Sequence, residues 1–410
     1  MKNFKLLSIL IGFLFTTYTS TSVFGIDLKG VINSHDPATL IKDGNVYWHF
    51  TTGDGIWSSV STNLISWSPS NKPVFARGTY PAWVKTYVPD FSGSFWAPDV
   101  IYMNNAFYIY YSCSQWGTTK SAIGVSKSTS LNSSDWTEKG KVVSSSGSSS
   151  EINAIDPGLF RDDDGQIYMV YGSWFGGIGI VDIDSVKGTA TSAVAHLYGG
   201  NHKSIEAPYL FKEEGYYYLV VNRGNCCDGV NSTYYITVGR SENVKGPYTD
   251  FRNLLTTSGK YIGPGHFGLL REPCANYVSI HYYDGNNNGN AKLDLLKMTM
   301  VDGWPSLTRN FTIVECQPNG IPAVIENNDH AFKLFPNPVV NGLLHLEINP
   351  NDLIQNQIQL TIYSASGKLV YSNDLEVAGI MDIETGLTRG IYHLRVKLGN
   401  TNYSKQFVVE

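Results

Sequence analysis

Residues 155–171 read Ile155-Asp156-Pro157-Gly158-Leu159-Phe160, then Arg161-Asp162-Asp163-Asp164-Gly165, then Gln166-Ile167-Tyr168-Met169-Val170-Tyr171. An acidic residue beside a proline precedes a short apolar run, an Asp-Gly turn and a second apolar run. An Asp-Gly pair between two such runs is a strong signal for a β-hairpin, because glycine adopts the positive φ that the turn requires. The stretch therefore predicts two antiparallel strands, with Asp156 at the start of the first.

The same pattern of marker, short strand, turn and aromatic strand occurs five times along the chain, the fifth time in degenerate form. The polar markers of the five copies follow one another at intervals of about 50 to 63 residues and are Asp36, Asp99, Asp156, Glu206 and His266. A repeat of this length, made of strands and turns, is typical of a propeller blade. The sequence therefore predicts an all-β protein whose main domain is a five-bladed β-propeller.

Radial repetition would bring equivalent positions of the blades to one rim of a central channel, so we expect Asp36, Asp156 and Glu206 to converge. Sugar hydrolysis needs one protonated carboxyl to donate to the leaving oxygen and one ionised carboxylate to activate water or attack carbon. A third carboxylate can raise the pKa of the acid, because like charges disfavour ionisation. Asp99 follows its proline instead of preceding it, and we interpret it as a structural or supporting residue.

Length and composition narrow the class of protein. The 410 residues fit one large and one small domain, and only 16% are charged whereas 13% are aromatic, with 26 Tyr and 9 Trp. A net charge of −5 without a Lys/Arg cluster argues against nucleic acid or an anionic membrane as partner. The composition is typical of an extracellular all-β protein.

The chain divides into four predicted segments. Residues 1–25 have the pattern of a signal peptide, with Lys2 and Lys5 before a short apolar run and small residues up to Gly25. That run is too short to cross a bilayer, and no later apolar run approaches the necessary length. We expect the propeller at 26–323, a polar linker at 324–331 and a small β-sandwich at 332–410, the last from period-two alternation in its strands.

The five cysteines leave at least one unpaired if the others pair. Cys226 and Cys227 are adjacent, and the sequence leaves open whether they form a vicinal disulfide or remain two reduced neighbours. Their spacing matches no zinc site. We expect Cys113, Cys274 and Cys316 to be ordinary buried thiols.

The five marker motifs, in order, resemble those of glycoside hydrolase family 43. The resemblance spans about residues 28 to 318 and is carried by His35-Asp36-Pro37, Trp96-Ala97-Pro98-Asp99, Asn153-Ala154-Ile155-Asp156-Pro157, Glu206-Ala207-Pro208-Tyr209 and Gly263-Pro264-Gly265-His266. Two further runs are similar to the endo-1,5-α-L-arabinanases of that family, namely Gly172-Ser173-Trp174 and Cys226-Cys227-Asp228-Gly229-Val230-Asn231-Ser232-Thr233-Tyr234.

This resemblance implies hydrolysis of arabinan, a pectin side-chain polysaccharide, inside the chain and with inversion of the anomeric carbon. It implies Asp36 as general base, Glu206 as general acid and Asp156 as the residue that tunes and orients the acid. It also implies that His266 faces a metal, usually calcium, held mostly by water. The alternative for His266 is a neutral core histidine.

Other motif residues are candidates for binding substrate. Trp96, Trp116 and Trp174 are expected to stack on arabinose rings, with a core position as the alternative. Asn153 and Ser173 are expected to hydrogen-bond substrate, unless they only cap blades. The shape of the cleft determines whether an enzyme of this kind acts internally or from a chain end, and the sequence does not give that shape. An exo-acting α-L-arabinofuranosidase or β-xylosidase therefore remains an alternative. A non-catalytic sugar-binding propeller is a further alternative.

The tail resembles the C-terminal sorting domain of the Bacteroidetes type IX secretion system. The matching runs are Leu334-Phe335-Pro336-Asn337-Pro338, Ile362-Tyr363 with Ser366-Gly367-Lys368, Gly390-Ile391-Tyr392 and Phe407-Val408-Val409. The resemblance implies export across the outer membrane by that machinery, so we expect a secreted or cell-surface monomer. A carbohydrate-binding module is the alternative for the tail.

Overall fold

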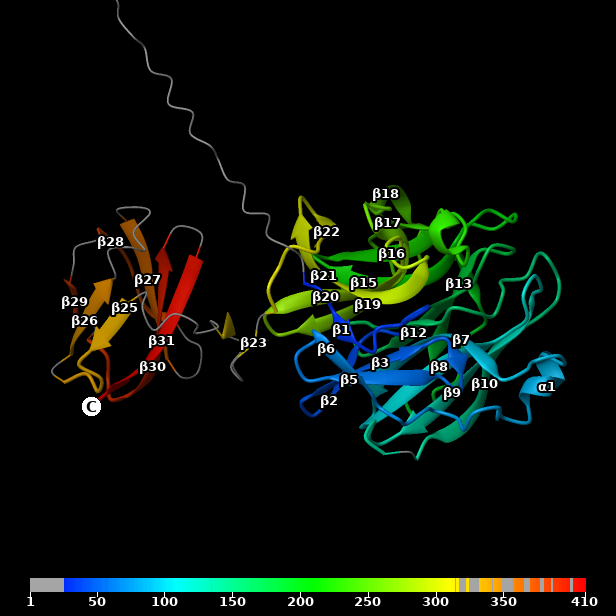
Figure 1. Ribbon diagram of the computed structural model, residues 1–410, viewed down its shortest axis with the longest axis horizontal. Coiled ribbons are helices and arrows are strands. Elements are labelled where there is room, and N and C mark those ends of the chain that lie inside the picture. The colour runs from blue at the N-terminus through cyan, green and yellow to red at the C-terminus, as the bar shows by residue number, and fades with distance from the viewer. Residues whose placement is uncertain are drawn as a thin grey trace, which may run out of the picture.

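The computed structural model describes residues 26–133, 135–313, 315–316, 322–323, 332–340, 342–348, 357–364, 369–376, 380–384, 386–398 and 401–410. The predicted signal peptide and linker lie outside these residues. Strands dominate throughout (Figure 1). Among the described residues, the helical elements are the four-residue helix α1 (Val84–Tyr87) and the 3-10 turn η1 (Gly229–Asn231). No helix in the described part of the chain has the length and apolar character needed to cross a membrane.

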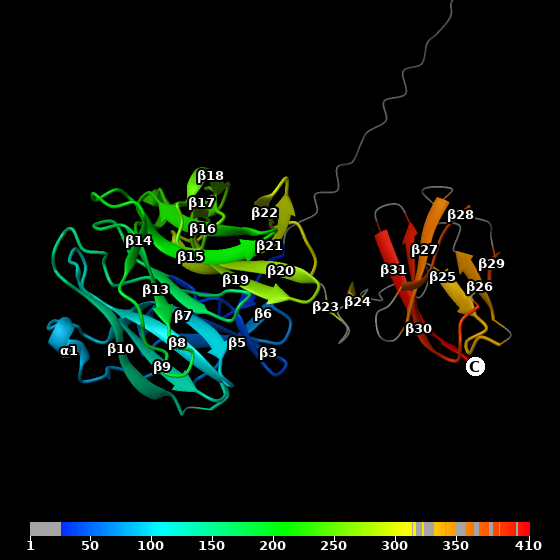
Figure 2. The same ribbon diagram turned by 180° about the vertical axis from the view of Figure 1, so that it is seen from behind.

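Five sheets follow one another between residues 29 and 308 (Figures 1 and 2). The first has the order β1-β6-β5-β3-β2 and the second the order β10-β9-β8-β7-β4. Strand β1 joins β6 in parallel, and the other pairs in these two sheets are antiparallel. Their strands are β1 (Lys29–Gly30), β2 (Ile41–Asp43), β3 (Val46–Thr51), β4 (Gly53–Asp54), β5 (Trp57–Ser61), β6 (Ser66–Pro69), β7 (Ser94–Met103), β8 (Ala106–Cys113), β9 (Lys120–Ser128) and β10 (Thr137–Ser146).

Each of the next three sheets is a four-stranded antiparallel meander in chain order. The predicted hairpin is confirmed in the third sheet, where β11 pairs with β12 across the Asp-Gly turn. The strands are β11 (Gly158–Arg161), β12 (Ile167–Tyr171), β13 (Ile178–Ile183), β14 (Ala195–Tyr198), β15 (Glu206–Glu213), β16 (Tyr216–Arg223), β17 (Tyr235–Ser241), β18 (Thr249–Leu255), β19 (Tyr261–Glu272), β20 (Ala275–Asp284), β21 (Asn290–Val301) and β22 (Trp304–Thr308).

Five apolar clusters hold these sheets together, each shared by two sheets. Four clusters join consecutive sheets, from the first and second to the fourth and fifth. The remaining cluster returns to the start of the chain, because Leu40, Tyr47 and Trp67 of the first sheet region pack with Leu270 and Leu295 of the fifth. The succession of cores therefore closes on itself. Burial of these aromatic and aliphatic side chains is the main favourable contribution to the fold.

One backbone feature recurs at the start of every repeat. Asp36, Ala97, Asp156, Ala207 and His266 all have φ between 42° and 62°. Residues other than glycine seldom adopt this left-handed region, and such strain is found most often at functional sites. The equivalent residue in the fourth repeat is thus Ala207, and Glu206 lies one position earlier. The expectation that the carboxylates of the first, third and fourth copies occupy the same position is therefore wrong for Glu206.

The tail contains a three-stranded sheet, β25-β26-β29, and a four-stranded sheet, β28-β27-β30-β31. Both contribute to one apolar cluster, because alternate residues of their strands are buried, such as Leu344 with Leu346 and Ile358 with Leu360. Strand β29 was not predicted from the sequence. The strands are β25 (Phe332–Phe335), β26 (Leu343–Ile348), β27 (Gln357–Ser364), β28 (Leu369–Glu376), β29 (Ile380–Glu384), β30 (Gly390–Leu398) and β31 (Thr401–Val409), and a short pair, β23 (Glu315–Cys316) with β24 (Pro322–Ala323), precedes them.

Candidate active site

Asp36, the predicted general base, lies in the loop before β2 and is held by several donors. Its Oδ2 accepts hydrogen bonds from Thr52 Oγ1 at 3.0 Å and from His35 Nδ1 at 2.8 Å, while its own amide donates to His281 Nδ1 at 3.1 Å. Oδ1 has no hydrogen bond among the described residues and lies 3.6 Å from Nδ1 of both His266 and His281. Oδ1 is therefore the oxygen left to accept a proton from water.

The histidines around Asp36 keep it ionised. Burial alone would raise the pKa of Asp36, but the charge and hydrogen bond of His35, with further contributions from His266 and His281, lower it well below its usual range. Burial would lower the pKa of His35, yet Asp36 and the more distant Glu206 raise it. Asp36 is therefore a carboxylate throughout the neutral and mildly acidic range.

Glu206, the predicted general acid, begins β15. Ser173 Oγ donates to its Oε2 at 2.9 Å, and Tyr234 and Trp174 also donate hydrogen bonds to it. Burial raises the pKa of Glu206, and the negative charge of Asp36 adds to this, so the three donors only partly offset the shift. The environments of Asp36 and Glu206 thus move their pKa values in opposite directions.

Asp156 lies directly before β11, and its side chain faces the same site. Its Oδ2 accepts a hydrogen bond from the amide of Ala207 at 3.1 Å, and its own amide donates to Ser112 Oγ at 3.0 Å. Burial raises the pKa of Asp156, and the charges of Glu206 and Asp36 raise it further. Asp156 and Glu206 therefore compete for protons and titrate as a pair.

Asp99 is buried and carries a structural contact, as the sequence suggested. Its Oδ1 accepts from the amide of Thr39 at 3.0 Å, and its Oδ2 accepts from the amide of Leu159 at 2.7 Å. Burial raises the pKa of Asp99 to about 6, against the hydrogen bonds that lower it. The side chain therefore joins the first, second and third repeats.

His266 lies in β19 and is buried. Its amide donates to Asn222 Oδ1 at 3.0 Å, and Nδ1 lies 3.6 Å from Asp36 Oδ1. Its Nε2 has no hydrogen-bond partner among the described residues, so it is available to a ligand or water. Burial lowers the pKa of His266, although Asp36 raises it, so the ring is neutral. Three other groups, His35, Asp36 and His281, offer ligand atoms within 4.8 Å of one another.

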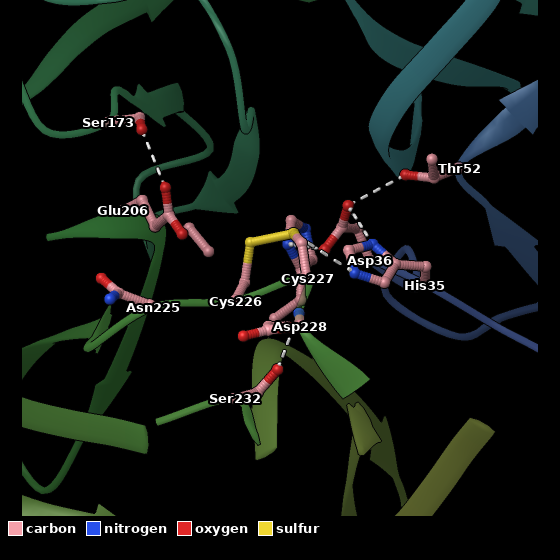
Figure 3. The surroundings of a disulfide bond; sticks show 12 residues. His35, Asp36, Thr52, Ser173, Glu206, Asn225, Cys226, Cys227, Asp228 and Ser232 are labelled. Atoms are coloured by element: carbon pink, nitrogen blue, oxygen red, sulfur yellow. Dashed lines mark hydrogen bonds and ion pairs between the residues drawn. A yellow bond between two sulfur atoms is a disulfide. The ribbon is translucent and has the colours of Figure 1, made fainter. Parts of the chain in front are cut away.

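The cysteine question that the sequence left open is answered by a disulfide between Cys226 and Cys227. Figure 3 shows this disulfide beside the site, with Glu206 and Ser173 on one side of the view and Asp36, His35 and Thr52 on the other. Cys113 is free and buried, as expected. Cys274 is disulfide-bonded, so the expectation of a buried thiol is wrong for it. The side chain of Cys316 lies outside the described residues.

The predicted substrate-binding residues differ in their surroundings. Ser173 and Trp174 bind Glu206, so they belong to the site. Asn153 is buried, and its Oδ1 accepts a hydrogen bond from Ser121 Oγ at 2.7 Å. Trp96 in β7 is half-buried, whereas Trp116 is 78% exposed and contacts none of the three carboxylates in the described structure.

Sequence reasoning missed several residues of the site. His35 and Thr52 bind Asp36 directly, Tyr234 binds Glu206, and His281 accepts the amide of Asp36. The positions of His35 and Tyr234 inside the quoted motifs were an available signal. His281 had a weaker one, since it is a polar residue inside an aromatic strand.

Comparison with known proteins identifies the family. The sequence model of glycosyl hydrolases family 43 matches residues 31–305. The chain belongs to glycoside hydrolase family 43. A second model, the secretion system C-terminal sorting domain, matches residues 333–410 and confirms the interpretation of the tail.

Family 43 relatives include endo- and exo-acting enzymes. The chain is 37% identical over 288 residues to an extracellular endo-α-(1→5)-L-arabinanase of Bacillus subtilis, covering 66% of this chain and 87% of that protein. It is 32% identical over 304 residues to an extracellular exo-α-(1→5)-L-arabinofuranosidase of Cellvibrio japonicus, covering 67% and 86%. The structure of a family 43 endo-arabinanase from Bacillus licheniformis superposes with a TM-score of 0.63 at 34% identity, covering 68% of this chain and 99% of that one.

Proposed function

We propose that this protein is an extracellular hydrolase that cleaves α-1,5-linked L-arabinan, the pectin side-chain polysaccharide, internally and with inversion. The observation that carries the proposal is the opposed environment of two carboxyls, Asp36 held ionised by histidines and Glu206 with its pKa raised by burial. Such a pair is what general acid–base hydrolysis of a glycoside needs. Membership of family 43 and the endo-acting relatives support arabinan as the substrate.

In this proposal Asp36 Oδ1 takes a proton from water as the water attacks the anomeric carbon. Glu206 gives its proton to the leaving oxygen, so the glycosidic bond breaks and the product has the inverted configuration. Asp156 and Glu206 oppose each other's ionisation, so the pair retains a proton, and Ser173 orients the acid through its hydrogen bond. Inversion requires room for water, which corresponds to carboxyl groups about 6.5–9.5 Å apart.

The proposed architecture follows from the sheets and the clusters between them. Each of the five sheets is one blade of a five-bladed β-propeller at residues 26–323, after a signal peptide at 1–25. A linker at 324–331 leads to a β-sandwich at 332–410. Trp96, Trp116 and Trp174 bind the polysaccharide at the channel mouth, with the buried Asn153 in support, and the protein acts as a monomer.

A calcium ion bound mainly through water is part of the proposal, because Nε2 of His266 lacks a hydrogen-bond partner among the described residues while Nδ1 faces Asp36. One nitrogen beside several waters fits a hard cation that prefers oxygen ligands. When bound, the ion would offset repulsion among the three carboxylates. His266 would hold it, and Asp36 would keep its own contacts with His35 and Thr52.

Digestion of linear arabinan tests the proposal directly. Internal cleavage produces a ladder of oligosaccharides early in the reaction, and proton NMR of the first product should show the inverted anomer. Release of single arabinose units or one short product from the start would favour the exo-acting alternative, which the Cellvibrio relative supports. Binding without cleavage would favour the non-catalytic alternative.

The sorting tail supports secretion or a cell-surface location, in agreement with the extracellular relatives. The tail partner is the type IX secretion machinery. The tail therefore supports a site of action outside the cell.

A further inference from the structure

The loop between β16 and β17 reaches the predicted base through a chain of hydrogen bonds. The amide of Cys227 donates to the phenolic oxygen of Tyr283 at 2.8 Å. That oxygen lies 2.8 Å from Nε2 of His35, and Nδ1 of His35 lies 2.8 Å from Oδ2 of Asp36. Cys227 Sγ also lies 3.7 Å from the same Nε2 (Figure 3). The chain thus runs from the disulfide to the carboxylate without a gap.

When His35 is neutral, the donor and acceptor roles give this chain one direction. Tyr283 accepts a hydrogen bond from the Cys227 amide, and its own hydroxyl then donates a hydrogen bond to Nε2 of His35. His35 then carries its proton on Nδ1 and donates it to Asp36. The ring of His35 stacks on His281, with 4.5 Å between ring centroids, which limits its rotation. Each group therefore orients the next.

The first donor of this hydrogen-bond chain, the amide of Cys227, belongs to a disulfide-bonded residue. Cys227 has a φ of 70°, a conformation seldom adopted by residues other than glycine. A covalent ring with its neighbour Cys226 restricts the backbone at this residue. The loop is closed by two more contacts, because the amide of Asn225 donates to Thr233 Oγ1 and the amide of Asp228 donates to Ser232 Oγ, each at 3.0 Å. The Cys227 amide is thereby aimed at Tyr283.

We propose that the Cys226–Cys227 disulfide is a positioning element for the general base. Through Tyr283 and His35 it holds Oδ2 of Asp36 and leaves Oδ1 directed to the attacking water. This inference rests on the proposed hydrolase function. It assigns no contact with substrate to the disulfide, to Tyr283 or to His35, so loss of any of them should change turnover more than substrate affinity.

Replacement of Tyr283 by Phe tests the middle of the chain, because it removes the hydroxyl and keeps the ring. We expect kcat on linear arabinan to fall about 10- to 100-fold with KM within about twofold of wild type, since small misplacement of a reacting group has effects of this size. Tyr282→Phe is the matched control, because Tyr282 points to the opposite face of β20 and should leave kcat unchanged. An unchanged kcat in Tyr283→Phe would overturn the inference.

The Cys226→Ser/Cys227→Ser double variant tests the start of the chain. Its kcat should fall like that of Tyr283→Phe, and combining both changes should reduce kcat no further, because residues that act through one another are not additive. A phosphine reductant should lower kcat of the wild type and leave the double variant unchanged. The Cys274 disulfide is present in both proteins, so its reduction cannot explain a difference.

Two outcomes separate this inference from the proposed function. A wild-type protein that does not cleave arabinan overturns the function and the inference together. An active wild type with fully additive variants, or with a rise in KM at unchanged kcat, overturns the inference alone. The KM result would mean that the disulfide contacts the sugar directly.

Discussion

At the scale of single residues, the site works by giving similar carboxyl groups different partners. Asp36 faces three imidazoles, whereas Glu206 faces a hydroxyl, a phenol, an indole and other carboxyls. Both groups are buried, so burial alone would raise both pKa values. The histidines reverse the shift only for Asp36. Replacing Asp36, Glu206 or Asp156 should therefore change activity in a different way for each residue.

Asp36→Ala and Glu206→Ala should each lower kcat by about 10²- to 10⁴-fold, the usual effect of losing a general base or acid. Binding of arabino-oligosaccharides should persist, because neither group is proposed to provide most of the affinity. Calorimetry of oligosaccharide binding beside steady-state kinetics would check both expectations. A near-wild-type rate in either variant would remove that residue from the mechanism.

Asp156→Asn keeps the acceptor for the amide of Ala207 but removes the charge that competes with Glu206. The last proton of the pair should then leave at lower pH, so the basic limb of the pH–rate profile should move downward. A carboxyl whose folded pKa is raised destabilises the fold above its unfolded pKa, so Asn should also raise Tm at pH 7 to 8 and not at pH 4. A basic limb at the wild-type position would contradict the assigned role.

The His266→Ala variant and treatment with a chelator both test whether a calcium ion is bound beside His266. Each should lower activity more than Tm, because the ion is proposed to order the water around the carboxylates and not the core. Metal analysis after dialysis is the direct measurement. If no cation remains bound and the chelator leaves the rate unchanged, His266 only packs and hydrogen-bonds in the core.

At the scale of strands and sheets, Asp99 is the side chain that joins repeats. Asp99→Ala would leave the buried amides of Thr39 and Leu159 without an acceptor, at a cost of about 2 to 5 kcal/mol in unfolding free energy. Asn should be almost as harmful, because one end of its amide is a donor and cannot accept an N–H. Thermal denaturation of both variants is the test. An Asn variant as stable as the wild type would show that one of the two contacts is dispensable.

The repeat was readable from the sequence because turns and alternating strands are local signals. Glu206 begins β15, Asp36 and Asp156 lie before β2 and β11, and Asp99 and His266 lie inside β7 and β19. The one-residue offset of Glu206 was missed, although Pro208 lies two positions after Glu206 whereas a proline directly follows Asp36 and Asp156. Nor did the sequence show Tyr283 at His35, since that contact joins residues 248 positions apart. No local sequence pattern pairs residues at such distances.

At the scale of the whole molecule, the tail has its own apolar cluster and contributes none of the described site residues. Truncation after Asn328 should therefore leave kcat and KM on soluble arabinan unchanged. In the native host the same truncation should retain the enzyme in the periplasm, which cell fractionation would detect. Normal secretion of the truncated protein would contradict the sorting role.

The cluster that packs the fifth sheet region against the first also governs when this protein can become active. Its members come from both ends of the large domain and extend to Ile313, so this core is complete only after Ile313 has been made. Contacts between residues so far apart in the chain slow folding, because long loops must close first. Hydrolytic activity therefore arises only in molecules whose synthesis has passed Ile313.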